Sequence, residues 1–167
     1  MKSKKDKFVF FWGGTFSQWA TSKFEIDGVE YNCCEQYMMA KKALVFNDFD
    51  ACREIMLEKQ PALQKAIGRK VRGFNVSKWE PVCRKIVYDA NMAKFTQNPK
   101  MLEELLATEG REIVEASPED KIWGIGLHET NPLAWDKETW QGLNLLGEAI
   151  MKVRDTITKE LAQADYQ

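Results

Sequence analysis

Glu35 and Lys42 lie seven residues apart in a segment typical of a helix, so their side chains share one helix face. Met38 and Met39 lie between them on that face, which is therefore apolar in its middle and oppositely charged at its ends. Seven residues of helix rise about 10 Å, too far for easy direct pairing of the two charges. A carboxylate and an amine that face one apolar pocket suit acid–base or imine chemistry on a sugar. The competing interpretation is a core helix whose two charged side chains extend outward at its edges.

A second group of candidate residues surrounds Trp123, whose indole offers a stacking face for a heteroaromatic base. Gly124 allows a backbone to approach a ligand closely. Asp120 and Glu115 are carboxylates that suit general acid–base chemistry or binding to ribose hydroxyls. The alternative is a tight turn around a buried tryptophan. The glycine pattern here lacks the strand and helix context of a Rossmann motif, so we do not expect a dinucleotide fold.

Three further polar side chains are candidates for binding a phosphorylated sugar. Asn144 lies where the last helix is expected to begin, and suits a sugar hydroxyl, while the backbone N–H groups there suit a phosphate. Close packing at the start of that helix is the alternative. Arg69 either clamps a phosphate with two hydrogen bonds or favours the C-terminus of its helix. Lys94 interrupts an apolar stripe, where it pairs either with a core carboxylate or with a substrate phosphate.

The composition indicates a globular protein without a strong electrostatic field. The chain has 167 residues, of which 44% are hydrophobic and 29% charged, and its net charge is −1. A general attraction to nucleic-acid backbones is therefore not expected. The four cysteines lack CxxC spacing and there is one histidine, which disfavours a structural zinc site and a disulfide framework. We expect a reducing, cytoplasmic location, no metal, no cofactor and no membrane span.

The pattern along the chain predicts a mainly α fold of the α+β class, multihelical with a small β-sheet. Strands are expected at residues 8–12 and 112–116, and a hairpin at residues 24–31 around Asp27-Gly28. The expected helices are the segment around Glu35 to Ala43 and those at residues 48–59, 61–67, 77–95, 99–110 and 143–153.

Two helix boundaries carry specific signals. Gly68 is expected to close the helix that begins at Pro61. Ser77 and Glu80 have the spacing of a capping box, which predicts Ser77 as the cap of the following helix.

The absence of repeats and low-complexity linkers indicates one compact unit. We expect a flexible basic tail at residues 1–7, a single domain at residues 8–160 and a C-terminal tail at residues 161–167. The chain is long enough for such a domain to bury a sizeable core.

Several separated motifs resemble the YbiA-like, or NADAR, family in their order and spacing over roughly residues 8–157. The motifs of the front half are Phe16-Ser17-Gln18-Trp19, Asp27-Gly28-Val29-Glu30-Tyr31 and Glu35-Gln36-Tyr37-Met38-Met39-Ala40-Lys41-Lys42-Ala43. Those of the middle are Gly68-Arg69 with Trp79, and Asn91-Met92-Ala93-Lys94-Phe95. Those of the back half are Leu105-Leu106-Ala107-Thr108, Ile113-Val114-Glu115-Ala116-Ser117, Asp120-Lys121-Ile122-Trp123-Gly124-Ile125-Gly126 and Gly142-Leu143-Asn144-Leu145-Leu146-Gly147.

The resemblance implies an N-glycosidase, which hydrolyses the bond between C1 of a ribose and a nitrogen. Its substrate would be a phosphorylated ribosyl compound of the kind formed early in riboflavin synthesis. One alternative is removal of ADP-ribose from guanine, in which case nucleic acid would be a partner only as an ADP-ribosylated substrate. The other alternative is a module that binds ADP-ribose or a related nucleotide without cleaving it.

The resemblance also assigns roles to residues of this chain. The family's glutamate and lysine correspond to Glu35 and Lys42. The expected catalytic residues are Glu35, Lys42 and Asp120. The expected substrate-binding residues are Arg69, Trp79, Lys94, Glu115, Trp123, Gly124 and Asn144.

Two routes would use the charged helix face. In the first, a carboxylate stabilises an oxocarbenium-like ribose while another activates water. In the second, which we favour, Lys42 attacks C1 of an opened ribose to form an imine, and Glu35 transfers protons. Desolvation beside Met38 and Met39 would lower the pKa of the lysine, as this route requires. Gln36 stands where many members of the family have histidine, so we expect a mechanism without imidazole at that position.

Overall fold

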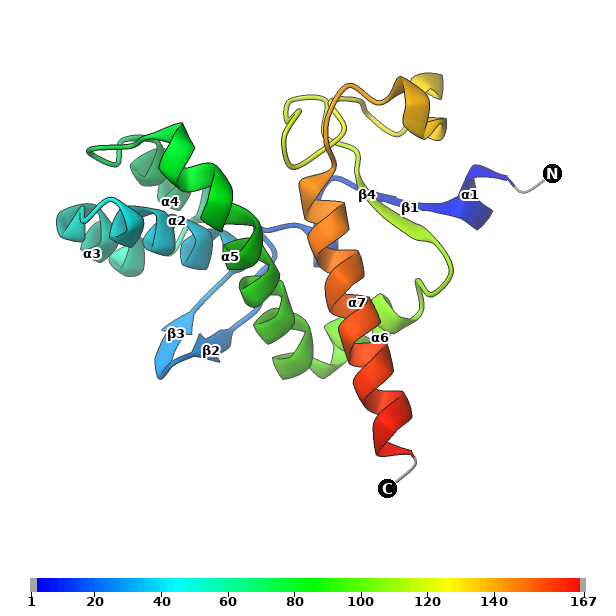
Figure 1. Ribbon diagram of the computed structural model, residues 1–167, viewed down its shortest axis with the longest axis horizontal. Helices are drawn as coiled ribbons and strands as arrows, with labels where there is room; N and C mark the ends of the chain where they lie inside the picture. The colour runs from blue at the N-terminus through cyan, green and yellow to red at the C-terminus, as the bar shows by residue number, and fades with distance from the viewer. Residues whose placement is uncertain (1–2, 166–167) are drawn as a thin grey trace. The chain divides into compact units, whose positions relative to one another are not determined.

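The computed structural model describes residues 3–165 and is drawn in Figure 1. Within that range the chain forms seven α-helices, three short 3-10 helices and four short strands, which confirms the predicted mainly α fold. The chain divides into two compact units: the central unit comprises residues 18–99, and the terminal unit comprises residues 3–17 with residues 100–165. Among the described helices, none is both long enough and apolar enough to cross a membrane.

The central unit consists of a hairpin and four helices. Its strands and helices are β2 (Phe24–Ile26), β3 (Val29–Tyr31), α2 (Cys34–Val45), α3 (Phe49–Leu57), α4 (Pro61–Arg69) and α5 (Val76–Gln97). β2 and β3 pair antiparallel, with Phe24 opposite Tyr31. The turn between them has φ of 52° at Asp27 and 82° at Gly28, because a tight hairpin turn needs left-handed backbone at both positions. The predicted hairpin is confirmed.

Helix α2 is the centre of this unit, since it packs against α3, α4 and α5. In Figure 1, α2, α3 and α4 lie side by side. Eight of the twelve residues of α2 are buried, so the helix is covered on most of its surface. This explains why a helix with a weak apolar stripe is nevertheless well packed: neighbours surround it instead of covering one face.

Gly68 has a different role from the one expected. It lies within the last turn of α4, which continues to Arg69, so the prediction that Gly68 closes the helix is wrong. A Cβ atom built at this position would collide with the side chain of Met39 on α2. The glycine therefore permits close approach of α4 to α2, next to the helix face that carries Lys42.

The start of α5 also corrects the sequence analysis. Asn75 is the N-cap, and its side-chain oxygen accepts a hydrogen bond of 2.8 Å from the N–H of Ser77. Ser77 is therefore inside the helix, and the predicted capping box is wrong. Asparagine caps a helix about as well as serine does, so the local pattern alone offered two equivalent starts.

The terminal unit is built from both ends of the chain. Its elements are α1 (Lys4–Lys7), β1 (Phe8–Phe11), the 3-10 helices η1 (Gly14–Phe16), η2 (Pro132–Trp135) and η3 (Lys137–Thr139), α6 (Pro99–Leu106), β4 (Glu112–Glu115) and α7 (Leu145–Ala164). β1 and β4 pair in parallel, with Phe8 opposite Glu112. Helix α7 packs against β4. The predicted strands and the C-terminal helix are therefore present.

A compact apolar cluster holds the loop after β4 against the two strands. Its buried members are Phe8, Val114, Ala116, Ile125, Leu127 and Ala134, with Phe10 and Trp140 packed against them. Trp140 also donates a hydrogen bond of 2.7 Å from its indole to the carbonyl of Ala134. The segment from Pro118 to Gly126 thus has an ordered path without helix or strand, as expected from its turn-rich sequence.

Helices extend into both stretches that the sequence analysis expected to be tails. Residues 4–7 form α1, and residues 161–164 continue α7. Residues 1–2 and 166–167 lie outside the described residues. The expected tails and the single domain at residues 8–160 stay predictions.

Candidate active site

The residues expected to form the site divide between the two units, and each group is described within its own unit. The central unit contains Glu35, Lys42, Arg69, Trp79 and Lys94. The terminal unit contains Glu115, Asp120, Trp123, Gly124 and Asn144.

Glu35 lies in the first turn of α2, and only 6% of its surface is exposed. Its position is favourable because the N-terminal end of a helix carries a partial positive charge. The N–H of Glu35 donates a hydrogen bond of 3.0 Å to the carbonyl of Gln18, which fixes the entry of the chain into α2. Together these features hold a carboxylate in the interior of the central unit.

The two thiols beside Glu35 are inert packing groups. Burial raises the pKa of Cys33 to about 11 and that of Cys34 to about 12, and the negative charge of Glu35 adds to both shifts. A thiol with such a high pKa is protonated at neutral pH and is a poor nucleophile. This agrees with the expectation that Cys33 and Cys34 are packing residues.

Lys94 is fully buried on α5. Its positive charge lowers the pKa of Cys33 and Cys34, the same two thiols whose pKa Glu35 raises. α2 and α5 therefore bring a buried carboxylate and a buried ammonium to the same region of the central unit. The ammonium nitrogen lies 5.1 Å from the centre of the Phe95 ring. Its expected partner, a core carboxylate or a substrate phosphate, stays a prediction.

Lys42 lies near the end of α2, and its side chain is partly buried. Burial lowers the pKa of the ammonium; the charge of Glu35 opposes this effect, and the charge of Arg69 on α4 adds to it. The direction of the shift and its largest cause agree with the expected desolvation. The pKa of Lys42 depends on the charges of both Glu35 and Arg69. The central unit therefore brings three of the predicted residues within electrostatic range of one another.

Two side chains that the sequence analysis gave no role connect α5 to the start of α2. Nδ2 of Asn91 donates hydrogen bonds to Oε1 of Gln18, at 3.0 Å, and to the carbonyl of Val87, at 2.8 Å. Asn91 is fully buried. The signal that would have identified it is a polar residue within the apolar stripe of a long helix, one turn before Lys94.

Phe74 is a further residue missed at the sequence level. Nζ of Lys42 lies 4.6 Å from the centre of its ring, within the range of a cation–π contact. The ring of Phe46 meets it edge-on at 5.3 Å, and 45% of Phe74 is exposed. Nothing in the local sequence marks Phe74, because its importance comes from the contact with Lys42 on α2.

Trp79 is buried on α5, with 9% of its surface exposed. A buried indole is the ordinary state of an apolar residue on a core helix. Its role in binding substrate, which came from the family resemblance, stays a prediction.

In the terminal unit, Asp120 organises the turn that leads to Trp123. Its Oδ1 accepts the N–H of Ile122 at 2.9 Å and that of Trp123 at 2.8 Å. Such a turn is a common use of an aspartate in loops. The side chain thereby fixes the position of the indole, and its predicted catalytic role stays untested.

Asn144 ties the start of α7 to strand β4. Its Oδ1 accepts the N–H of Glu115 and its Nδ2 donates to the carbonyl of Ile113, both at 3.0 Å. The residue is buried and has a left-handed backbone, with φ of 53°. The structure therefore favours the packing alternative over a contact with a sugar hydroxyl.

The expected phosphate site at the start of α7 is wrong. The N–H groups of Leu145 and Leu146 donate to the carbonyls of Ile122 and Trp123, so they do not point at a ligand. Gly124 contributes to the same close packing, because a Cβ atom there would approach the carbonyl of Glu115 within 2.9 Å. Hydrogen bonds thus connect the five predicted residues of the terminal unit through β4, the turn at Asp120 and the start of α7.

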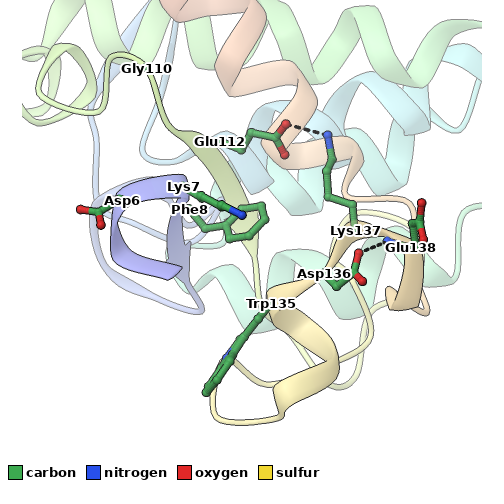
Figure 2. Close-up of a pocket in the computed structure, with 9 residues that line it drawn as sticks. All are labelled: Asp6, Lys7, Phe8, Gly110, Glu112, Trp135, Asp136, Lys137 and Glu138. Carbon is green, nitrogen blue, oxygen red and sulfur yellow. Dashed lines mark hydrogen bonds and ion pairs between the residues drawn. The ribbon is translucent and has the colours of Figure 1, made fainter. Parts of the chain in front are cut away.

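The terminal unit also has an open pocket, which Figure 2 shows in close-up, and none of the predicted residues lines it. Lys137 extends to Glu112 at its edge, where the ammonium and the carboxylate oxygen are 2.6 Å apart. Asp136 caps the following turn through the N–H of Glu138 at 2.9 Å. Among the described residues, no group of three or more His, Cys, Asp or Glu side chains is placed to hold a metal ion.

Comparison with known proteins identifies the family. A family model described as the NADAR domain matches residues 10–158. The chain belongs to the NADAR domain family. This confirms the resemblance found in the sequence motifs. The ten predicted site residues lie within the matched range, and their roles stay predictions.

Three curated relatives and one solved structure extend the comparison. N-glycosidase R617 of Acanthamoeba polyphaga mimivirus is 42% identical over 163 residues, covering 90% of this chain and 96% of that protein. The chloroplastic riboflavin biosynthesis protein PYRR of Zea mays is 33% identical over 126 residues, covering 70% of this chain but 18% of the maize protein. The NMR structure of the E. coli protein YbiA matches with a TM-score of 0.78 and 27% identity, over 94% of this chain and 88% of that one. The curated sequence of that protein, N-glycosidase YbiA, is 29% identical over 147 residues. The NADAR fold of this chain is therefore the YbiA-like fold.

Proposed function

We propose that this NADAR protein is an N-glycosidase that hydrolyses the bond between ribose C1 and nitrogen in a phosphorylated ribosyl compound. The enzyme class is supported by relatives named N-glycosidase at 42% and 29% identity. A substrate of the riboflavin-intermediate type is supported by the similarity to the maize riboflavin biosynthesis protein. The observation that carries the proposal is the environment of Lys42, a partly buried amine that has a lowered pKa and interacts electrostatically with the buried Glu35 on the same helix.

In the proposed route, the neutral amine of Lys42 attacks C1 of the ring-opened ribose, where carbon is doubly bonded to the nitrogen of the base. The lysine nitrogen forms the new bond to C1 and loses its two protons, and the bond between C1 and the base nitrogen breaks. Glu35 carries these two protons to the leaving nitrogen, which departs as the amino group of the base. Water then adds to the lysine imine, which releases the sugar phosphate as an aldehyde and restores the amine. The sum of these steps is hydrolysis, with no cofactor.

Arg69 is the group we propose for the substrate phosphate. Its guanidinium lies at the exposed end of α4, and its charge acts on Lys42. A phosphate bound there would be close to the amine, and a guanidinium pairs with phosphate through two hydrogen bonds. Lys94 and Trp79 complete the proposed set of substrate contacts within the central unit. The predicted roles of Asp120, Glu115 and Trp123, which belong to the terminal unit, stay predictions.

The decisive experiment is product analysis combined with trapping. The protein is incubated with a phosphorylated ribosylamino-pyrimidine and, separately, with an ADP-ribosylated guanine oligonucleotide, and released base and sugar are separated by chromatography. With borohydride present, we expect mass spectrometry to find the reduced sugar phosphate on Lys42. If Lys42→Arg remains active and no adduct forms, the imine route is wrong and the oxocarbenium route takes its place.

The two substrates also distinguish the alternatives. Turnover of the oligonucleotide alone would make the protein an ADP-ribosyl hydrolase acting on guanine. Tight binding of ADP-ribose without turnover of either substrate would make it a binding module and would end the proposal of an enzyme.

A further inference from the structure

The contact between Lys42 and Phe74 locates an aromatic surface beside the proposed nucleophile. Nζ of Lys42 is 4.6 Å from the centre of the Phe74 ring. In the proposed reaction, an attacking nitrogen approaches C1 of the sugar to about 3–3.5 Å. The leaving base is bonded to that same carbon, so it also lies close to the ring of Phe74.

The distances fit a stacked arrangement of two rings. Aromatic rings associate with their centres about 4.5–7 Å apart. A base attached to the carbon that Lys42 attacks can reach this distance from the ring of Phe74, because the attacking amine is itself only 4.6 Å from the centre of that ring. The ring of Phe74 is therefore positioned to contact the leaving base as well as the sugar.

The loop and a neighbouring ring fix the position of Phe74 but leave part of its side chain exposed to solvent. The loop carrying it has a left-handed glycine, Gly73, with φ of 77°. The ring of Phe46 supports it edge-on at 5.3 Å, with an interplanar angle of 63°. Even so, 45% of Phe74 remains exposed, unlike the core aromatic residues of the same unit such as Phe95, which is fully buried.

We propose that Phe74 is a base-stacking residue, which makes the enzyme select substrates whose leaving nitrogen is an amino group attached to a planar heteroaromatic ring. This inference rests on the proposed function. Stacking of a base would displace the Lys42 ammonium from the ring. Because a cation over an aromatic ring is stabilised in its charged form, that displacement favours the neutral amine needed for attack.

The test compares two substrates and three variants. The substrates share ribose 5-phosphate and differ in the leaving group: an aminopyrimidine in one and simple ammonia in the other. Phe74→Leu removes the ring but keeps an apolar side chain, Phe74→Tyr keeps the ring, and Phe49→Leu removes another exposed ring of the central unit as the control. Phe49 is 61% exposed at the start of α3.

We expect Phe74→Leu to lower kcat/KM about 5- to 100-fold for the aminopyrimidine substrate, the effect of losing one base–aromatic stack. The ammonia substrate should change by less than about twofold, and Phe74→Tyr and Phe49→Leu should resemble the parent protein with both substrates. Equal losses with the two substrates, or no loss with either, would overturn the inference.

Failure of the proposed function gives a different result. If the parent protein releases base from neither substrate, the free aminopyrimidine is titrated into the parent and into Phe74→Leu. Weaker binding by the variant, with an unchanged melting temperature, still supports stacking. Equal binding by the two proteins overturns it.

Discussion

Asn91 and Gln18 are joined by a hydrogen bond of 3.0 Å between their side-chain amides. The carbonyl of Gln18 accepts the N–H of Glu35, so the bond links α5 to the first turn of α2. Among the described residues, no group donates a hydrogen bond to Oδ1 of Asn91. Nδ2 of Asn91 is therefore the atom that connects α5 to Gln18. The main chain of Glu35, at the start of α2, is thus tied to α5 through Gln18 and Asn91.

Asn91→Ala should destabilise the protein by about 1–3 kcal/mol, because the buried carbonyl of Val87 and Oε1 of Gln18 each lose a donor. Urea denaturation measures this change. Thr96→Ala is the matched control: it removes an exposed hydroxyl that bonds to the carbonyl of Met92 on the same helix. It should change stability by less than about 0.5 kcal/mol. Equal effects of the two substitutions would contradict a structural link through Asn91.

Arg69→Gln should move the pH dependence of catalysis. The imine route needs neutral Lys42, so kcat rises with pH as the ammonium loses its proton. The charge of Arg69 lowers the pKa of Lys42, so its removal raises that pKa and shifts the rising limb of kcat to higher pH.

Lys70→Gln is the control for this shift, because it removes the same charge from the adjacent exposed position. Lys70 is not among the groups that shift the pKa of Lys42. The measurement is kcat at saturating substrate, which separates the pKa effect from weaker phosphate binding. If the rising part of the kcat–pH profile of Arg69→Gln stays in place or moves to lower pH, the charge of Arg69 does not lower the pKa of Lys42.

Gly68→Ala should destabilise the protein by about 1–3 kcal/mol, since the added methyl group collides with Met39. The sign is informative, because glycine to alanine in an exposed helix position ordinarily stabilises by up to about 1 kcal/mol. A thermodynamic cycle with Met39→Ala tests the cause. In that background the cost of the alanine at position 68 should largely vanish, and an unchanged cost would place the strain elsewhere.

Asp48→Asn should remove an acid-sensitive part of the stability. The N–H of Arg72, then its guanidinium and the N–H of Ala51, lower the pKa of Asp48 to about 2 from 3.8. A carboxyl whose pKa is lower when folded contributes stability above its unfolded pKa, which disappears as pH falls toward the folded value. Stability of the parent should therefore decline between about pH 4 and pH 2 through this group.

Urea titrations across that interval give the measurement for Asp48. The variant should be less stable at neutral pH and should have a shallower decline in acid. Asp50→Asn is the control, since Asp50 also contacts Arg72, at 3.3 Å, but its side chain is 69% exposed. A decline that is as steep in Asp48→Asn as in the parent would contradict the assignment.

Local patterns predicted the elements that carry the candidate site. The helix with Glu35 and Lys42, the hairpin around Asp27-Gly28 and the strand from Phe8 follow from periodicity and turn chemistry within a few residues. Where two local signals were equivalent, as at Asn75 and Ser77, the sequence could not choose between them. Which of two residues becomes the N-cap depends on how the resulting helix packs against other elements, and the local sequence does not contain that information.

The missed features all depend on a neighbour distant in sequence. In the sequence Gly68 is typical of a residue that ends a helix. Its actual role, close packing against Met39, is visible only in the fold. Phe74 has no pattern of its own, and its importance comes only from the Lys42 ammonium above its ring. Asn144 suggested a ligand contact, but its partners are main-chain groups of β4. Spacing along one helix identifies a pair of side chains, whereas contacts between elements require the fold.

The parallel pairing of β1 with β4 has a consequence for how the chain is made. β1 emerges from the ribosome before residues 18–99, but its partner β4 is synthesised only after them. During that interval the edges of an aromatic strand have no β4 to pair with, whereas the central unit already has all its elements. We expect the central unit to become protected in nascent chains first, and truncated chains ending before Glu112 to be prone to aggregation through their first strand.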